Sequence, residues 1–310
     1  MNKKVLSNFA LFLTALIWGV SFVAQKAGMD YVGAFSFNFA RSILGGISLI
    51  PLIFLVKMTT PDNRPKKLKH LQHWYLFKAG AFCGLALFTA MSLQQYSMIS
   101  ASAGKAGFIS ALYIIFVPLI SMFFGAKLEN KIKVSVGLAL VGLYLLCFKG
   151  GLTGFDMYDG LLLIGAFFYG VHILVVNHFS RHVNPVKMSC VQFFVVGLLS
   201  LPFMLMFENP VVANFVAAKT PILYAGILTC GVAYTLQIFG QKFTPPTIAS
   251  IILCMESVFA VVGGSLILHE TMTPREVWGC IFMIIAVVLS QIQMKNFKKG
   301  LTVCSQNNEE

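Results

Sequence analysis

Long apolar stretches recur along this chain of 310 residues, and each is long enough to cross a lipid bilayer as a helix. A transmembrane helix needs about 20 predominantly apolar residues. The pattern predicts an all-α integral membrane protein with ten transmembrane helices. The predicted spans are 8–25, 35–56, 75–97, 103–124, 133–150, 157–177, 186–207, 221–241, 246–268 and 274–293.

The composition supports a membrane protein rather than a soluble one. Hydrophobic residues make up 57% of the chain and charged residues 11%, and the mean hydropathy is +0.81. One water-soluble core cannot bury that much apolar surface. Little sequence lies between the spans, and the longest connection, 57–74, is a basic loop. We therefore expect no soluble domain between the helices.

The net charge of +12 is explained by where the cations lie. If the N-terminus is cytoplasmic, most Lys and Arg residues outside the spans fall in cytoplasmic connections. The outside connections then hold only Lys26, Lys149, Lys219 and Arg275. This bias predicts that both termini are cytoplasmic and that the protein is a multi-pass protein of the cell membrane. The basic charge is thus a topology signal, and we expect no nucleic-acid partner.

The two halves of the chain are similar in sequence. An offset of 151 residues places Trp18 on Tyr169 and Gly19 on Gly170, and an offset of 146 places Gln95 on Gln241. The order of such matches predicts two five-helix repeats, 1–150 and 151–300, followed by a polar cytoplasmic tail, 301–310. Because five is odd, the second repeat is expected to cross the membrane in the opposite sense, as in alternating-access transporters.

Four segments carry a resemblance to a known family. They are WGVSF (18–22), FNFARSILGG (37–46), SAGKAGFISALYIIFVPL (102–119) and LCMESVFAVVGGSLILHETMTPREVWG (253–279). The chain resembles the EamA family of the drug/metabolite transporter superfamily over nearly its whole length. The resemblance implies a ten-helix carrier of small metabolites, with the fifth and tenth helices outside the group that surrounds the cavity. It does not name a substrate.

Glu256 is the most informative polar residue within a span. It lies roughly 15 Å along the helix that starts at Pro246, near the membrane midplane. A charge at a helix centre costs about 2.5–3.5 kcal/mol on insertion scales. The carboxyl group must be neutral, paired with a cation or in contact with an aqueous cavity. Two interpretations stay open: a buried glutamate bonded to neighbouring helices, or a site for a solute, an ion or a proton.

Two cations also lie in or near the spans. Lys105, near the outer start of 103–124, either extends to the interface or points inward, where it would hold an anionic group of the solute or neutralise Glu256. Arg41, about two turns into 35–56, either contacts an anion or ties helices together through backbone carbonyls. Gln192 is the repeat partner of Arg41.

Aromatic and neutral polar residues complete the candidate site. Trp18 and Tyr169 occupy equivalent places near the middle of their helices, so they either form stacking walls for a solute or pack the interior. His172 lies opposite Ser21 by the repeat and either lines the cavity or is structural. The candidate substrate-binding residues are Trp18, Ser21, Arg41, Gln94, Lys105, Tyr113, Tyr169, His172, Gln192, Tyr234, Gln237 and Glu256.

These observations predict a secondary transporter that exports a small organic metabolite or drug-like solute by alternating access, with the proton as a candidate coupling ion. No GxxxxGK[ST] segment is present, so no nucleotide site is expected, and we expect no cofactor or metal. The alternatives are a membrane-embedded enzyme or a receptor that does not transport. An enzyme is less favoured because His269-Glu270 lacks the second histidine of an HExxH metal site. The protein is expected to be a monomer or a homodimer.

Overall fold

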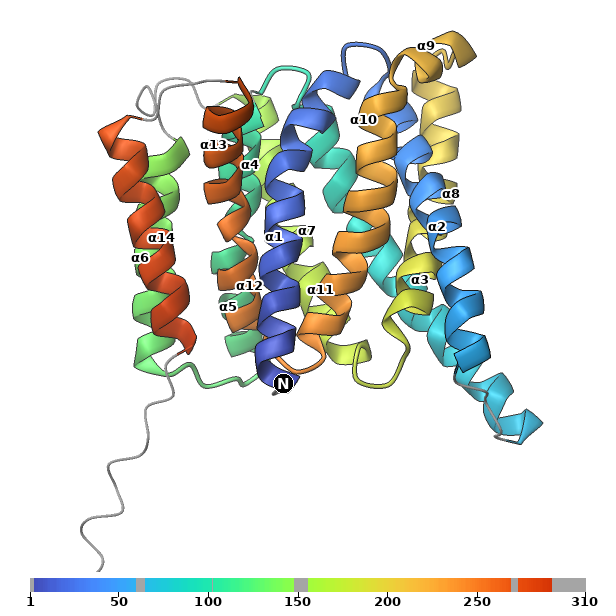
Figure 1. Ribbon diagram of the computed structural model, residues 1–310, viewed down its shortest axis with the longest axis horizontal. Coiled ribbons are helices and arrows are strands. Elements are labelled where there is room, and N and C mark those ends of the chain that lie inside the picture. The colour runs from blue at the N-terminus through green and yellow to red at the C-terminus, as the bar shows by residue number, and fades with distance from the viewer. Residues whose placement is uncertain (1–2, 60–64, 102, 148–155, 269–272, 292–310) are drawn as a thin grey trace, which may run out of the picture.

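The computed structural model describes residues 3–59, 65–101, 103–147, 156–268 and 273–291, and this part of the chain is helical throughout, without strands (Figure 1). The predicted tail, 301–310, lies outside these residues. The elements are α1 (Lys3–Gly28), α2 (Ala34–Thr59), α3 (Lys66–Ser97), α4 (Ala103–Ala111), α5 (Tyr113–Phe123), α6 (Asn130–Cys147), α7 (Met157–Phe179), α8 (Pro185–Phe207), α9 (Val212–Ala217), α10 (Lys219–Leu223), the π-helix η1 (Tyr224–Ala233), α11 (Tyr234–Gln241), α12 (Pro246–Leu253), α13 (Met255–Leu268) and α14 (Pro274–Gln291).

The all-helical membrane architecture is confirmed. In the described ranges, 8 helical segments are long and apolar enough to cross a membrane, and each falls on a predicted span. The other two predicted spans are also helical where they are described. The span 133–150 falls on α6, described up to Cys147, and 246–268 falls on α12 and α13, whose apolar part Pro246–Val262 is shorter than the others.

Two of the predicted spans are interrupted near their middle. Each break is a single residue, Leu112 between α4 and α5 and Cys254 between α12 and α13, where the regular helical hydrogen bonding is disturbed. Both residues keep right-handed helical backbone angles, so Lys105–Phe123 and Pro246–Val262 each remain one helical segment. The thiol of Cys254 donates a hydrogen bond to the carbonyl of Ala111 at 3.4 Å, so the two breaks lie against each other. In Figure 1, α4 lies above α5 whereas α13 lies above α12, so the two interrupted helices run in opposite directions. A break in a membrane helix is tolerated where protein or a cavity satisfies the freed backbone groups.

Glycines let the helices around these breaks approach closely. A Cβ atom on Gly19 of α1 would lie 2.6 Å from the backbone oxygen of Glu256 and 2.7 Å from Cβ of Phe259. A Cβ atom on Gly170 of α7 would lie 3.1 Å from Cβ of Phe116. Small residues at such crossings allow close backbone contact, which helix association in lipid requires. The sequence WGVSF therefore sets the distance between α1 and α13.

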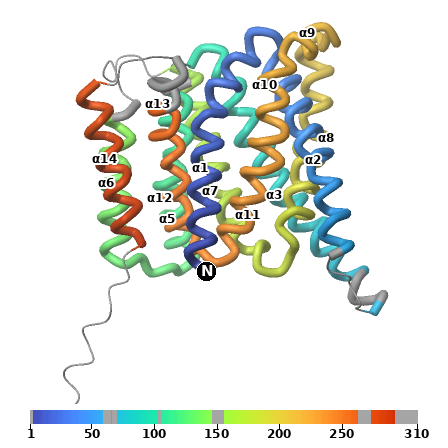
Figure 2. Tube along the Cα trace, in the orientation of Figure 1, coloured from blue at the N-terminus to red at the C-terminus, as the bar shows by residue number. Residues whose placement is uncertain are grey.

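The pair formed by α6 and α14 lies at one side of the bundle (Figure 2). A Cβ atom on Gly142 of α6 would lie 2.9 Å from the backbone oxygen of Gly279, so these helices also pack closely. α6 falls on the predicted fifth span and α14 on the predicted tenth. Their position agrees with the place that the family resemblance implies for them.

Glu208, just after α8, holds the first turn of α2 in place. Its carboxylate accepts hydrogen bonds from the backbone N–H groups of Phe35 and Ser36, both at 2.8 Å, and from the Ser36 hydroxyl at 2.6 Å. Gly33 lies against this carboxylate, where a Cβ atom would collide with it. A carboxylate at a helix N-terminus satisfies unpaired donors and interacts favourably with the helix dipole. Glu208 therefore links a helix of the first half to a helix of the second half.

We expect Glu208→Ala to lower the free energy of unfolding by about 1–2 kcal/mol, the usual cost of losing an N-terminal cap. Thermal unfolding of the purified protein in detergent measures the change. The matched control is Glu129→Ala, because Glu129 is 69% exposed and pairs with Lys131 at 2.8 Å, and exposed ion pairs contribute little to stability. Equal effects of the two substitutions would contradict the capping role.

Candidate functional site

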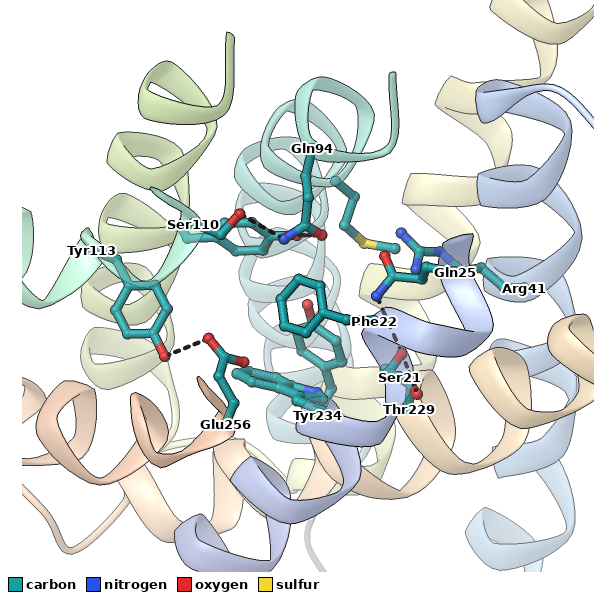
Figure 3. Close-up of a pocket in the computed structure, with 13 residues that line it drawn as sticks. Ser21, Phe22, Gln25, Arg41, Gln94, Ser110, Tyr113, Thr229, Tyr234 and Glu256 are labelled. Atoms are coloured by element: carbon teal, nitrogen blue, oxygen red, sulfur yellow. Dashed lines mark hydrogen bonds between the residues drawn. The ribbon is translucent and has the colours of Figure 1, made fainter. Parts of the chain in front are cut away.

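A small buried cavity lies between the two halves of the chain (Figure 3). Its volume is about 40 Å³, which is enough for a few water molecules, since each needs roughly 10–15 Å³ of cavity. The helices α1, α2, α3, α4 and α5 contribute from the first half, and α7, η1, α11 and α13 from the second. The lining residues are Trp18, Ser21, Phe22, Gln25, Arg41, Met91, Gln94, Ser110, Tyr113, Tyr169, Thr229, Tyr234 and Glu256.

The carboxyl group of Glu256 lies on the wall formed by the two helix breaks. Glu256 is two residues beyond the break at Cys254 and is 4% exposed. Its Oε1 atom accepts a hydrogen bond from the hydroxyl of Tyr113 at 3.0 Å, and Tyr113 directly follows the break at Leu112. The breaks thus bring an ionisable group and its hydrogen-bond donor together inside the bundle.

Arg41 of α2 lines the same cavity and is 2% exposed. Its Nε and Nη2 atoms are buried and have no hydrogen-bond partner among the described residues. The guanidinium lies 5.3 Å from the centre of the Phe37 ring, a cation–π contact that replaces part of its lost hydration. In Figure 3, Arg41 and Glu256 lie on opposite sides of the view, with Phe22 and Tyr234 between them.

Aromatic and amide groups form the remaining walls. The rings of Trp18 and Tyr234 lie 4.7 Å apart, centre to centre. The hydroxyl of Tyr169 donates to Oε1 of Gln94 at 2.8 Å, and the amide of Gln94 donates to the Ser110 hydroxyl at 2.8 Å. These bonds fix the orientation of the Gln94 side chain between α3, α4 and α7.

A second set of polar groups extends along α1. The amide of Gln25 donates to the Ser21 hydroxyl at 3.2 Å, and the hydroxyl of Thr229 donates to the same oxygen at 3.0 Å. Thr229 lies in η1, and π-helical turns of this kind often occur at functional sites. The arrangement offers apolar surface, neutral hydrogen-bonding groups and two ionisable side chains, which together suit the binding of a small organic solute.

Comparison with known proteins agrees with this geometry. The model of the EamA-like transporter family matches residues 5–148 and again residues 157–291, which together cover nearly the whole chain. The chain belongs to the EamA-like transporter family.

Curated relatives of this EamA-like transporter have similar length. One from Archaeoglobus fulgidus, named an uncharacterized transporter, is 30% identical over 94% of this chain and 88% of its own. The uncharacterized transporter YoaV of Bacillus subtilis is 23% identical over 89% of this chain and 93% of its own. A solved crystal structure superposes with a TM-score of 0.71 at 16% identity over 92% of this chain and 96% of its own, which shows a shared fold. These names and the helices indicate a transporter embedded in a lipid bilayer.

Most of the candidate residues predicted from the sequence of this EamA-like transporter lie at the cavity, which places them but does not test their roles. The other residues that line the cavity carry no charge and belong to no recognisable motif. Gln25 was detectable as a polar residue one turn after Ser21, whereas the others are too common in membrane helices to stand out. The predicted candidates that line the cavity are Trp18, Ser21, Arg41, Gln94, Tyr113, Tyr169, Tyr234 and Glu256. The lining residues that were not predicted are Phe22, Gln25, Met91, Ser110 and Thr229.

The hypothesis that Lys105 neutralises Glu256 is wrong. The Nζ atom of Lys105 forms an ion pair with Oδ2 of Asp159 at 2.6 Å, and Lys105 does not line the cavity. Asp159 and Asp156 form a capping box at the N-terminus of α7, each carboxylate accepting a backbone N–H of the other residue. Lys105 lies at the start of α4, well before the break, so its side chain reaches the neighbouring helix terminus. It joins α4 to α7 and is left out of the proposed binding site.

Three other candidates lie outside the cavity. The Nε2 atom of His172 is 3.2 Å from Oε1 of Gln192, and its ring is 5.9 Å from that of Tyr234. His172, Gln192 and Gln237 are almost completely buried but do not line the cavity. Of the two alternatives left open for His172, lining the cavity does not hold in this conformation, because the side chain points to α8 and packs against Tyr234.

Within the described ranges, no group of three or more His, Cys, Asp or Glu side chains is arranged to hold a metal ion.

Proposed function

We propose that this protein is a secondary transporter that exports a small organic solute by alternating access, with ten transmembrane helices arranged as two inverted repeats. The observation that carries the proposal is the buried cavity where the two interrupted helices meet, with a carboxyl group and a guanidinium in its walls. Ionisable side chains are costly in a membrane and typically mark solute, ion or proton pathways. Binding sites of carriers also lie at repeat interfaces, near interrupted helices.

Contacts around the two breaks support the inverted repeat. The bond between Cys254 and Ala111 and the bond between Glu256 and Tyr113 both join residues that are 143 positions apart. If two repeats are related by a pseudo-twofold axis, residues close to the axis contact their own equivalents in the other repeat. All such pairs then have the same separation in sequence number, as these two pairs do.

The glycine contacts follow the same relation. Gly19 packs on Phe259, and its repeat partner Gly170 packs on Phe116. The two phenylalanines have the same separation in sequence as the residues paired at the breaks. Each repeat thus places its first helix against the interrupted helix of the other repeat. Two equivalent sets of contacts provide two packings of similar energy, which alternating access requires.

The small size of the cavity supports a conformational cycle. A space for a few water molecules is too small for an organic metabolite, so solute binding requires the surrounding helices to separate. Trp18 and Tyr234 lie in contact at this cavity, and Tyr234 separates it from the buried polar group formed by His172 and Gln192. We propose that this second group borders the path toward the cytoplasm in the other state.

Glu256 is the proposed proton site. Among the described lining residues it has the only carboxyl group, and it lies where the two breaks meet, at the axis of the proposed repeat. A group in that place is reached from one side of the membrane in one packing and from the other side in the second. Its protonation and release would couple solute movement to a proton gradient.

Purified protein in liposomes that are loaded with an aqueous extract of bacterial cells tests this function. We expect a small set of solutes to leave these liposomes faster than protein-free liposomes, without ATP and without chemical change. Mass spectrometry measures the amount of each compound that is released and shows whether it has been chemically changed. Equal release from the two preparations would contradict transport, and compounds absent from the starting extract would indicate an enzyme instead.

A further inference from the structure

We propose that the solute carries a carboxylate that binds the Nε–H and Nη2–H groups of Arg41. The inference rests on the proposed function and assigns the chemical class of the solute. It follows from the hydrogen bonding of the guanidinium, its electrostatic surroundings and the apolar residues that line the cavity.

The two unpartnered nitrogen atoms of Arg41 form one edge of the guanidinium. Nε and Nη2 each have an N–H bond on this edge, and the two bonds are parallel. This fork matches the two oxygen atoms of a carboxylate, which accept both hydrogen bonds in one plane. Both atoms are buried and lack a partner among the described residues. The edge without hydrogen-bond partners is therefore the one whose geometry matches a carboxylate.

A structural role does not account for these donors. An arginine that ties helices together donates to backbone carbonyls or pairs with a carboxylate. In the described part of the chain, neither Nε nor Nη2 of Arg41 has a hydrogen-bond acceptor, and no described carboxylate forms an ion pair with it. A buried charge with unpaired donors is unfavourable, because it has lost water and gained no equivalent contacts. An anionic solute would restore both the charge balance and the hydrogen bonds.

The charge of the cavity favours a carboxylate over a phosphate. Arg41 is the one Lys or Arg residue among the described lining residues, and Glu256 adds a carboxyl group to the same cavity. A phosphate group carries up to two negative charges, and sites for it usually gather several cationic or backbone donors. A single guanidinium balances a single carboxylate.

The rest of the solute would contact an apolar surface. In Figure 3, Phe22 and Tyr234 lie between Arg41 and Glu256. Met91 and Trp18, whose ring packs on that of Tyr234, line the same cavity. These side chains offer few hydrogen bonds, although the Nε1 atom of Trp18 is also unpartnered among the described residues. The solute we infer is a small organic monocarboxylate with an apolar body.

The liposome experiment with the bacterial extract tests this inference on the unmodified protein. We expect the solutes released through the protein to contain a carboxylate. Release of amines, neutral compounds or organic phosphates in place of carboxylates would overturn the inference while leaving transport intact. Release of no solute would contradict the proposed function and the inference with it.

Substitutions of Arg41 provide a second test with the carboxylate that is released. Arg41→Gln is expected to raise the carboxylate concentration that gives half-maximal transport by about 10- to 100-fold. This is the usual effect of losing charge-assisted hydrogen bonds. Gln192 occupies the equivalent place in the second repeat, so a glutamine is compatible with this position of the helix. Arg41→Lys keeps the charge but loses the fork, so an intermediate reduction is expected.

The matched control is Lys242→Gln, which removes a cation that lies outside the cavity, close to the Phe243 ring. It is expected to transport the carboxylate with wild-type affinity. Gel filtration and thermal unfolding show whether each variant is folded. Wild-type affinity in folded Arg41→Gln protein, or an equal loss in Lys242→Gln, would overturn the assignment of Arg41.

Discussion

Liposomes that contain the Glu256→Gln variant are expected to exchange solute across the membrane but to lose its accumulation against a gradient. Glutamine has the same size and still accepts the hydrogen bond of Tyr113, but it cannot take up and release a proton. A gradient of two pH units supplies about 2.7 kcal/mol per proton, which supports roughly 100-fold accumulation. In the variant, the accumulation ratio is expected to fall to about one, because solute then equilibrates without coupling.

The accumulation ratio and the exchange of labelled solute are measured on the same liposome preparations. Glu129→Gln is the matched control, because it removes a carboxylate that is 69% exposed and does not line the cavity. It is expected to accumulate solute as the wild type does. Accumulation by Glu256→Gln with an unchanged pH dependence would show that the coupling role is assigned to the wrong residue.

The second large effect is expected from Gly19→Ala. Its new methyl group would lie 2.6 Å from the backbone oxygen of Glu256 and 2.9 Å from the backbone nitrogen of Ala260. Backbone atoms cannot rotate away, so α1 and α13 must separate, and overpacking of this kind typically costs about 1–3 kcal/mol. The shift would also displace Glu256 from Tyr113. We expect a lower unfolding temperature in detergent and the loss of most transport in liposomes.

Gly137→Ala is the control for the same chemical change. Nothing lies within 4 Å of a Cβ atom built on Gly137 of α6. Alanine is favoured over glycine in a helix by about 1 kcal/mol, so this variant is expected to be as stable as the wild type or more stable. Transport is expected to be unchanged. If Gly19→Ala behaved like Gly137→Ala, the close packing of α1 on α13 would not be needed for function.

The positions of the helices were predictable from the sequence because the membrane imposes a length on every apolar segment. The breaks at Leu112 and Cys254 were not predictable, since neither residue stops a helix as proline does and the contact between the breaks joins segments far apart in the sequence. The predicted tail 301–310 lies outside the described residues. The ten-helix inverted repeat and the orientation of the termini stay predictions.

Part of the site was predictable because charge in a membrane requires an explanation. Glu256 and Arg41 were selected on that ground, and both line the cavity. The ion pair of Lys105 with Asp159 was not among the alternatives considered for Lys105, because hydropathy gives the depth of a residue but not the direction in which its side chain points. The same limit explains His172, which lies at a suitable depth but contacts Gln192. Glu208 was missed because a helix cap supplied by a distant segment leaves no local signal.

The opposite orientation of the two repeats is tested most directly by labelling from one side of the membrane. Glu129→Cys, between α5 and α6, and Arg275→Cys, at the start of α14, are introduced one at a time into protein whose reactive cysteines are replaced by serine. A membrane-impermeant maleimide is then added outside intact cells. Two inverted repeats with cytoplasmic termini predict labelling of Arg275→Cys, and of Glu129→Cys only after the membrane is permeabilised. Labelling of both variants from the same side would contradict the inverted repeat and the transport mechanism built on it.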